Sequence, residues 1–241
     1  MLSKSLVQFI NSLKINKYRK IHRKFIAEGP KIAGELLSNS AGLLVIDKIL
    51  SVKKWIEEYK NSIPDNVELI EITEKELKKI SSLKSPNQVI VIVNIPNRET
   101  IPRNIYSDLT LMLDEIKDPG NMGTIIRTAD WFGISNIICS NECVDVYNPK
   151  VVQATMGSLA RVSIFYTNLE KNIYETKLKN RGLILIGNES KGVSAKLKPF
   201  ITDNISIPSF PVSEERSTES LNASIAAAIV CAEFKRNRQK K

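Results

Sequence analysis

Short apolar runs alternate with amphipathic segments along most of the chain, which predicts strands and helices in alternation. In the first part we expect the order helix, helix, strand, helix, strand, helix, strand. The expected strands there are 43–46, 67–72 and 89–93, and helical spacing is clearest at 6–13 and 32–37. Thr73 and Glu76 form a capping-box pair that predicts the start of a further helix. This alternation predicts a small α/β sandwich in the first part.

Residues 96–107 contain Pro96 and Pro102 and show no periodicity, which predicts a linker. After it the alternation restarts. The expected strands are 109–113, 136–140, 162–166, 182–186 and 204–207. The expected helices are 121–132, one near 149–160, one near 168–179 and one from about 219 to 235. Short apolar strands joined by helices predict a mostly parallel sheet that is covered on both faces. We therefore expect an N-terminal domain over 1–95, the linker, and a larger α/β domain over 108–241.

Positive charge is concentrated at both ends of this chain of 241 residues, whose formal net charge is +9. Such a field attracts polyanions and releases counterions when nucleic acid binds. The first basic run predicts an RNA-binding surface, and its candidate residues are Lys14, Lys17, Arg19, Lys20, Arg23 and Lys24. A solvated helix face that aids solubility and an anionic membrane surface are the alternatives. Nucleic acid is favoured over membrane because the first helix lacks Trp and large apolar bulk.

The rest of the composition, with 42% hydrophobic and 25% charged residues, is typical of a globular protein. No apolar run approaches the roughly 20 residues that span a bilayer, and the N-terminus lacks the apolar core of a signal peptide. We therefore expect a cytoplasmic protein that does not bind membrane. Three cysteines give no disulfide framework, and with His22 as the one histidine we expect no metal site. Cys139 is expected to be a small core residue on a strand.

A strand, a tight turn and a helix start are predicted around residues 109–132. Pro119 and Gly120 end the apolar run, so Asn121 falls at the turn and Arg127 about two turns into the helix. Polar groups in this position face the carboxyl end of a sheet, where open α/β folds bind their ligands. The alternative is an ordinary turn followed by a surface arginine.

Two later strands are predicted to end in the same manner. Gly187 follows the apolar run 183–186 and permits close backbone approach, and Glu189 adds a carboxylate at that edge. Pro208 ends the run at 205–207, and the turn at 220–224 supplies hydroxyl, amide and backbone donors before an alanine-rich helix. Taken singly, these residues could equally be a turn glycine, a strand stop and a helix N-cap. The pattern lacks the G-x-G-x-x-G turn of dinucleotide sites.

Taken together and in order, the three segments resemble the SpoU (TrmH) family of RNA ribose methyltransferases over roughly 109–233. The intervening stretch 148–158 also resembles that family. The N-terminal region is similar to the ribosomal-protein-like RNA-binding domain of many members, through Phe25 and the stretch Glu28-Gly29-Pro30. One departure is the longer loop at 209–219, which carries Glu214, Glu215 and Glu219.

The resemblance implies an α/β domain with a deep trefoil knot, a homodimer, S-adenosylmethionine as cofactor and transfer of methyl to a ribose 2′-hydroxyl. Ribosomal RNA is the expected substrate, because the separate N-terminal domain resembles that of ribosomal-RNA-modifying members. The alternatives are methylation of tRNA or of an RNA base, and a non-catalytic protein that binds RNA or the ribosome. By position, the implied catalytic residues are Asn121, Arg127, Glu189, Ser220 and Asn222, and the implied cofactor-binding residues are Ile186, Gly187, Ile207, Pro208 and Leu221.

Arg127 is a poor general base because a guanidinium stays protonated at neutral pH. Our hypothesis is that Arg127 clamps a phosphate and favours negative charge on the hydroxyl oxygen. We expect Asn121 to fix Arg127 or the ribose by hydrogen bonds, and Glu189 to orient donors rather than to take the proton.

Overall fold

The computed structural model describes residues 2–39, 43–97, 101–102, 105, 108–169, 183–208 and 221–238. The chain forms two compact units, one of Met1–Glu99 with Asp145–Val162 and one of Thr100–Val144 with Ser163–Lys241. Residues 145–162, which we expected in the C-terminal domain, thus belong to the first unit. Most of the predicted linker lies outside the described residues, and the domain boundaries stay a prediction.

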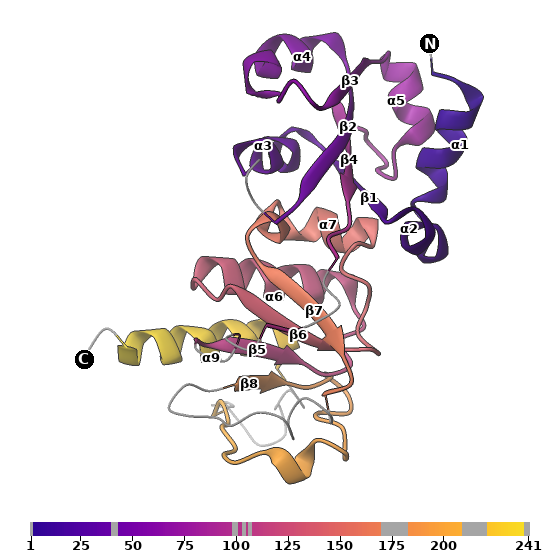
Figure 1. Ribbon diagram of the computed structural model, residues 1–241. Coiled ribbons are helices and arrows are strands. Elements are labelled where there is room, and N and C mark those ends of the chain that lie inside the picture. Colours follow the sequence, from indigo (N-terminus) through magenta and orange to yellow (C-terminus); the bar gives the residue numbers. More distant parts are fainter. Residues whose placement is uncertain are drawn as a thin grey trace, which may run out of the picture. The chain divides into compact units, whose positions relative to one another are not determined.

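The first unit is an α/β layer structure around a mixed sheet (Figure 1). Its strand order is β1-β4-β2-β3, in which β2 and β3 are parallel and the other two pairs are antiparallel. The elements are α1 (Lys4–Ser12), α2 (Asn16–His22), β1 (Lys24–Glu28), α3 (Pro30–Ser38), β2 (Val45–Ser51), α4 (Lys53–Tyr59), η1 (Lys60–Ser62), β3 (Glu68–Glu71), α5 (Glu74–Ile80), β4 (Val89–Asn94), α7 (Pro149–Thr155) and η3 (Ser158–Ala160).

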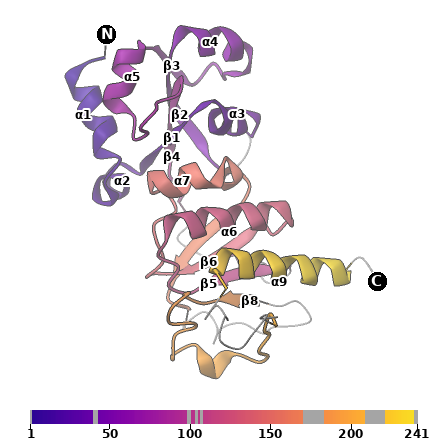
Figure 2. The same cartoon turned by 180° about the vertical axis from the view of Figure 1, so that it is seen from behind.

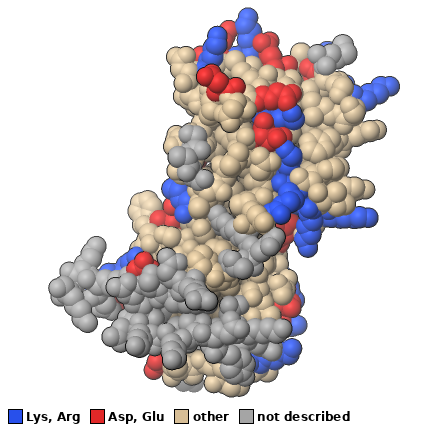
Figure 3. All heavy atoms as spheres, in the orientation of Figure 1, with Lys and Arg blue, Asp and Glu red and all other residues tan. Residues whose placement is uncertain are grey.

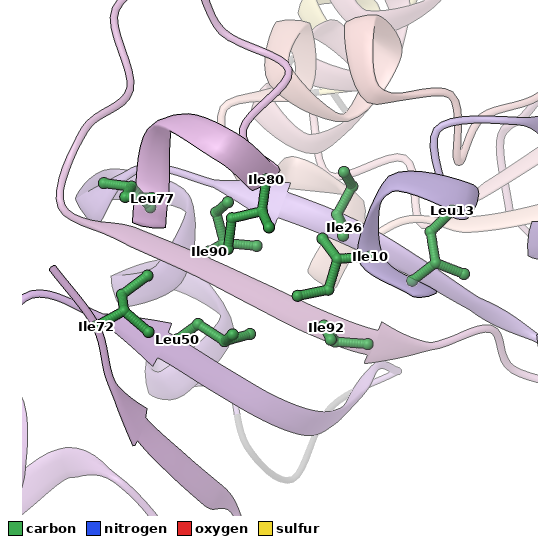
Figure 4. Packing of buried hydrophobic residues seen from close by; sticks show 9 residues of the cluster. All are labelled: Ile10, Leu13, Ile26, Leu50, Ile72, Leu77, Ile80, Ile90 and Ile92. Atoms are coloured by element: carbon green, nitrogen blue, oxygen red, sulfur yellow. The ribbon is translucent and has the colours of Figure 1, made fainter. Parts of the chain in front are cut away.

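The core of the first unit forms where alternate residues of the strands face α1 and α5. Ile26, Leu50, Ile90 and Ile92 come from the sheet, and Ile10 belongs to α1 (Figure 4). Helices α3 and α4 lie on the opposite side of the sheet from α1 and α5 (Figure 1). Since every second side chain of a strand points to the same face, both faces of this sheet are covered.

The predicted capping box at the start of α5 is confirmed. The Glu76 amide donates to Thr73 Oγ1 at 3.3 Å, and the Thr73 amide donates to Glu76 Oε2 at 2.9 Å. The hydrogen bond from the Thr73 backbone, followed by that from Leu2, lowers the pKa of Glu76 to about 2. The pattern missed α2 and β1. In β1, Lys24 and Glu28 leave only three apolar residues between charged ends.

The second unit is built on a four-stranded sheet of order β7-β6-β5-β8 in which every pair is parallel. This confirms the expected parallel sheet. Its elements are β5 (Thr110–Leu113), α6 (Pro119–Trp131), β6 (Asn136–Ser140), β7 (Ser163–Thr167), β8 (Leu183–Ile186), η4 (Lys198–Phe200) and α9 (Ala223–Arg238). Seen from behind, α6 and α9 lie side by side on one face of the sheet (Figure 2).

The opposite face of this sheet is apolar and covered by connecting segments. Met112, Ile138 and Phe165 from three neighbouring strands pack with Leu169 and Leu197. Cys139 is fully buried on β6, as expected. The predicted strand at 204–207 is wrong, because this segment is irregular and Ile205 is 60% exposed. Most of the predicted helix near 168–179 lies outside the described residues.

No helix in the described part of the chain has the length and apolar character needed to cross a bilayer.

Residues 145–162 are held in the first unit by one buried ion pair and close packing. Arg19 donates through Nε at 3.0 Å and Nη2 at 2.6 Å to Asp145 Oδ2, and through Nη1 at 3.0 Å to the Leu13 carbonyl. The Phe25 and Tyr147 rings lie 4.8 Å apart. The Arg19 side chain is 2% exposed, so the prediction that Arg19 binds RNA is corrected: its guanidinium is occupied inside the unit.

We expect Arg19→Met to lower the free energy of unfolding by about 2 kcal/mol, because the Leu13 carbonyl loses its side-chain donor and the Asp145 carboxylate loses its charged partner. Urea denaturation followed by tryptophan fluorescence measures this loss. Trp55 is fully buried in this unit and Trp131 is 86% exposed, so the signal change reports mainly on the first unit. The control Lys20→Met, at an exposed position of the same helix, should change the value by less than about 0.5 kcal/mol. Equal losses in both variants would contradict the buried pair.

Candidate active site

The candidate site lies at the carboxyl ends of β5 and β8, which are neighbours in the parallel sheet. The Asp114 amide donates to the Ile186 carbonyl at 2.9 Å and so continues the pairing of these strands. Asp114 Oδ2 accepts from the Ser194 amide at 2.9 Å, and the Glu115 carbonyl accepts from Asn188 Nδ2 at 3.0 Å. The turn after β5 and the loop after β8 are therefore bonded to each other.

A second set of contacts shapes the turn after β5 from the side of β6. Ser140 Oγ accepts from the Glu115 amide at 3.0 Å, and Cys143 Sγ accepts from the Ile116 amide at 3.3 Å. The Cys139 thiol hydrogen-bonds to Cys143, which raises the pKa of Cys139 and lowers that of Cys143. These buried groups fix the backbone that leads into α6.

Helix α6 begins at Pro119 with Asp118 as its N-cap, whose Oδ1 accepts from the Asn121 amide at 2.7 Å. Proline suits this first helical position because it has no N–H to satisfy and its φ is already helical. Asn121 is thereby held in the first turn of the helix, with its side chain at the carboxyl edge of the sheet.

The loop after β8 folds back tightly on itself. Asn188 and Gly192 exchange two backbone hydrogen bonds of 3.0 and 2.8 Å, and Asn188 Oδ1 accepts from the Ser190 and Lys191 amides. A Cβ at Gly187 would lie 2.5 Å from the Gly192 carbonyl carbon, so only glycine fits without a backbone shift. This tight loop presents Glu189 at the site.

Three segments meet at one carboxylate oxygen. Glu189 Oε1 accepts from Asn121 Nδ2 at 2.7 Å, from Asn222 Nδ2 at 2.7 Å and from the Ala223 amide at 3.1 Å. Asn222 Nδ2 also donates to Asn121 Oδ1 at 2.9 Å. In the described part of the chain Glu189 Oε2 has no hydrogen-bond partner, so it remains free to accept from a ligand.

Asn222 also starts helix α9. Its Oδ1 accepts from the Ser224 amide at 3.0 Å, from Ser224 Oγ at 2.6 Å and from the Ile225 amide at 3.4 Å. This is N-cap geometry, in which a side-chain oxygen satisfies amides that lack a helical partner. The side-chain amide of Asn222 thus caps the helix through its oxygen and binds Glu189 and Asn121 through its nitrogen.

Of the predicted catalytic residues, the structure brings together Asn121, Glu189 and Asn222. Arg127 is exposed on α6, and among the described residues it has no hydrogen-bond or ion-pair partner. The expected bond between Asn121 and Arg127 is not formed, because Asn121 is engaged by Glu189 and Asn222. Ser220 lies outside the described residues.

The predicted cofactor-binding residues lie in the second unit. Ile186 is buried at the end of β8 and directly precedes Gly187. Leu221 is 44% exposed and directly precedes Asn222. Ile207 is half-buried and Pro208 is exposed in the irregular segment that follows η4. An apolar side chain exposed beside the polar cluster is a suitable surface for a flat, partly apolar group.

Two polar residues that shape the site were missed from the sequence. Asp114 is 4% exposed and anchors the Ser194 amide, and Asn188 closes the loop that carries Glu189. Their position could have indicated them: Asp114 directly follows β5, and Asn188 is the second residue after β8.

The predicted RNA-binding residues of the first unit divide into exposed and engaged groups. Lys17 and Lys20 are exposed on α2, and Arg23, exposed directly after it, donates through Nη2 to Asn97 Oδ1 at 3.2 Å. Lys and Arg atoms gather on the side of this unit where α2 lies (Figure 3). Lys14 is half-buried and donates to the Ser81 carbonyl at 2.8 Å; burial lowers its pKa, and Glu28 opposes this. Lys24 forms an ion pair with Asp47.

Among the described residues, no group of three or more His, Cys, Asp or Glu side chains could hold a metal ion.

Comparison with known proteins agrees with this architecture. Residues 108–173 match the SpoU rRNA Methylase family, and residues 4–91 match the MRM3-like substrate binding domain. A solved TrmH-family structure from Porphyromonas gingivalis is 34% identical, with a TM-score of 0.85, over 98% of this chain and 99% of that one. An rRNA methyltransferase from Sinorhizobium meliloti, solved with AdoMet bound, is 27% identical, with a TM-score of 0.82, over 98% of this chain and 96% of that one.

Among curated proteins, the chain is 24% identical to the 23S rRNA (guanosine(2553)-2'-O)-methyltransferase RlmP of Bacillus subtilis (strain 168), over 93% of this chain and 96% of that protein. The parallel sheet, the polar cluster at its carboxyl edge and these similarities define one class. The chain belongs to the SpoU (TrmH) family of RNA methyltransferases.

Two substitutions at Asn222 separate its structural role from its role in the site. Asn222→Ser keeps a capping oxygen but removes both amide N–H donors, whereas Asn222→Ala removes both functions. Because a lost N-cap costs about 1 kcal/mol, we expect the Ala variant to be less stable than the Ser variant by about that amount. Urea denaturation of the two variants measures the difference. Equal stability would contradict the capping role.

Proposed function

We propose that the protein is an S-adenosylmethionine-dependent methyltransferase that methylates a ribose 2′-hydroxyl in ribosomal RNA, in the cytoplasm. The observation that carries this proposal is the shared Glu189 oxygen, which fixes two asparagine amides at the carboxyl edge of a parallel sheet. The family membership and the rRNA-methylating relatives support the same reaction and substrate.

The residues proposed to hold the cofactor are Ile186, Gly187, Ile207, Pro208 and Leu221. The tight loop at 187–192 and the exposed Leu221 side chain fit a ligand that joins a flat adenine ring to a polar amino-acid end. When bound, S-adenosylmethionine supplies an electrophilic methyl group on a sulfonium sulfur. A carboxylate oxygen such as Glu189 Oε2 suits a cationic or hydrogen-bond-donating group in this site.

The polar cluster is proposed to orient the ribose. Asn121 Nδ2 has two hydrogens, and Glu189 uses one, so the second is available to a ribose oxygen. Asn222 Nδ2 spends both hydrogens on Asn121 and Glu189, so Asn222 acts as a positioning residue. Holding the 2′-oxygen in line with the methyl group removes much of the entropic barrier to transfer.

Arg127 is proposed to bind a phosphate next to the target nucleotide and to stabilise negative charge that develops on the 2′-oxygen. Its exposure on α6, without a partner among the described residues, leaves its guanidinium available for bidentate phosphate binding. Ser220 is proposed to contribute a hydroxyl to the same site.

The first unit is proposed to bind RNA through Lys17, Lys20 and Arg23 on its basic side. A separate proposal concerns the second unit, which is proposed to carry a deep trefoil knot and to form a homodimer through α6 and α9. Trp131 is 86% exposed at the end of α6, and Ile225 and Ile229 are 50% and 43% exposed on α9. Apolar groups exposed on two neighbouring helices are a surface that a second copy would cover.

The proposed reaction is tested by incubating the protein with methyl-labelled S-adenosylmethionine and total RNA, containing ribosomal RNA and tRNA, that lacks the modification. We expect label in ribosomal RNA and one new position resistant to alkaline cleavage, because a methylated 2′-oxygen cannot attack the adjacent phosphate. Label without alkali resistance would indicate base methylation, and label in tRNA alone would favour a tRNA enzyme. Absence of cofactor binding by calorimetry, with and without RNA, would favour a non-catalytic RNA-binding protein.

Arg127→Lys should lower kcat at saturating RNA by about 100-fold, because lysine keeps the charge but not the planar fork. Cofactor affinity measured by calorimetry should stay within about twofold of wild type, which controls for damage to the site. A turnover near that of wild type would contradict the bidentate role.

A further inference from the structure

The first unit contains a cavity of about 350 Å³ that the methyl-transfer site does not use. It is bounded by the end of β1, by Ser82 and Leu83 after α5, and by α7. Its volume falls within the roughly 300–1,000 Å³ of small-molecule sites.

Two stretches that stand out in the sequence, and that have no part in the proposed reaction, meet at this cavity. One is Glu28-Gly29-Pro30 at the end of β1, and the other is 148–158, which contains α7. Glu28 from the first and Lys150 and Gln153 from the second line the same space. More than a hundred residues separate them in the chain, so the tertiary fold assembles this site.

The polar wall of the cavity is a buried carboxylate that is held in place. Glu28 is 6% exposed; its Oε1 accepts from the Ser82 amide at 2.8 Å and its Oε2 accepts from Ser81 Oγ. Lys14, which bonds to the Ser81 carbonyl, keeps positive charge nearby. Because each carboxylate oxygen can accept two hydrogen bonds, Glu28 retains a pair of acceptors for a ligand.

The other walls are apolar, and the rim is polar and positive. Ile26, Leu83, Ala154 and Met156 provide surfaces against which a flat ring can pack. Lys150 is exposed and lines the cavity, so its cation is accessible to a phosphate. A polyanion with flat, donor-bearing rings matches this combination of groups.

We propose that this cavity binds an unpaired guanine nucleotide of the RNA substrate. Guanine presents two neighbouring donors, N1–H and the 2-amino group, to the paired acceptors of Glu28. Adenine and cytosine offer an amino group without an adjacent ring N–H, and uracil offers a single ring N–H. Lys150 binds the phosphate and Gln153 supplies an amide at the rim. This inference rests on RNA being the substrate, as proposed above, and adds a contact outside the reacting site.

The test measures the affinity of the full chain, without cofactor, for short labelled RNAs by fluorescence anisotropy. The RNAs are oligouridines with one central guanosine, adenosine or cytidine, and uridine alone. We expect the guanosine RNA to bind about tenfold more tightly than the uridine RNA. Ala154→Phe, which fills the cavity from α7, should abolish that preference, and so should Glu28→Gln.

Matched lysine variants control for general electrostatics. Lys150→Ala should weaken binding of the guanosine RNA more than Lys54→Ala, which removes the same charge from an exposed position on α4. The proposal is overturned if Lys150→Ala and Lys54→Ala weaken binding equally. It is also overturned if the wild type shows no preference for guanosine, or if the preference survives in Ala154→Phe.

Cofactor binding by calorimetry separates this inference from the proposed function. Ala154→Phe should bind S-adenosylmethionine as the wild type does, because the cofactor residues lie in the second unit. Unchanged fluorescence of Trp55, which is fully buried in the first unit, shows that the unit carrying the substitution is folded. A wild type that prefers guanosine but binds no cofactor would refute the methyltransferase function and leave the cavity assignment standing. A wild type that binds cofactor but shows no preference for guanosine would refute the cavity assignment and leave the methyltransferase function standing.

Discussion

A carboxylate oxygen that accepts from three donors organises the second unit. Glu189 Oε1 binds the side chains of Asn121 and Asn222 and the amide of Ala223, and these residues come from the starts of α6 and α9 and from the loop after β8. A charged acceptor strengthens each of these bonds and fixes which way both amides face. The two helices therefore begin at fixed points relative to the sheet edge, and the groups proposed to meet the ribose are oriented before it binds.

The surroundings of this oxygen explain why the loop after β8 has its particular shape. Gly187 allows the backbone to pass close to Gly192, and Asn188 satisfies both the amides of the loop and the carbonyl of Glu115. The buried Asp114, which directly follows β5, accepts a hydrogen bond from the Ser194 amide. A buried polar group is costly unless it is paired, and the buried Asp114 and the half-buried Asn188 use their hydrogen bonds to hold the backbone that presents Glu189.

Charge in the first unit serves two different purposes, which a count of lysines and arginines does not separate. Arg19 is buried in an ion pair with Asp145. Lys14 donates to the Ser81 carbonyl, and Lys24 forms an ion pair with Asp47. Lys17, Lys20 and Arg23 remain exposed and are the residues proposed to meet RNA. Burial of Arg19 is stable because its fork is matched by a carboxylate and a carbonyl, whereas the exposed cations keep their water until RNA displaces it.

The sequence by itself determined the parallel sheet of the second unit, the capping box of α5, and the positions of Asn121 and Glu189 after strands and of Asn222 before a helix. Buried parallel strands are apolar on both faces, so each of them gives a short continuous apolar run in the sequence. The pattern missed β1, whose charged ends leave too short an apolar run, and it predicted a strand wrongly at 204–207. Only the tertiary structure decided that the three polar residues share one oxygen, that Arg19 is internal and that Glu28 meets α7. Such contacts join residues about a hundred positions apart, and local spacing carries no information about which distant partner a polar group will find.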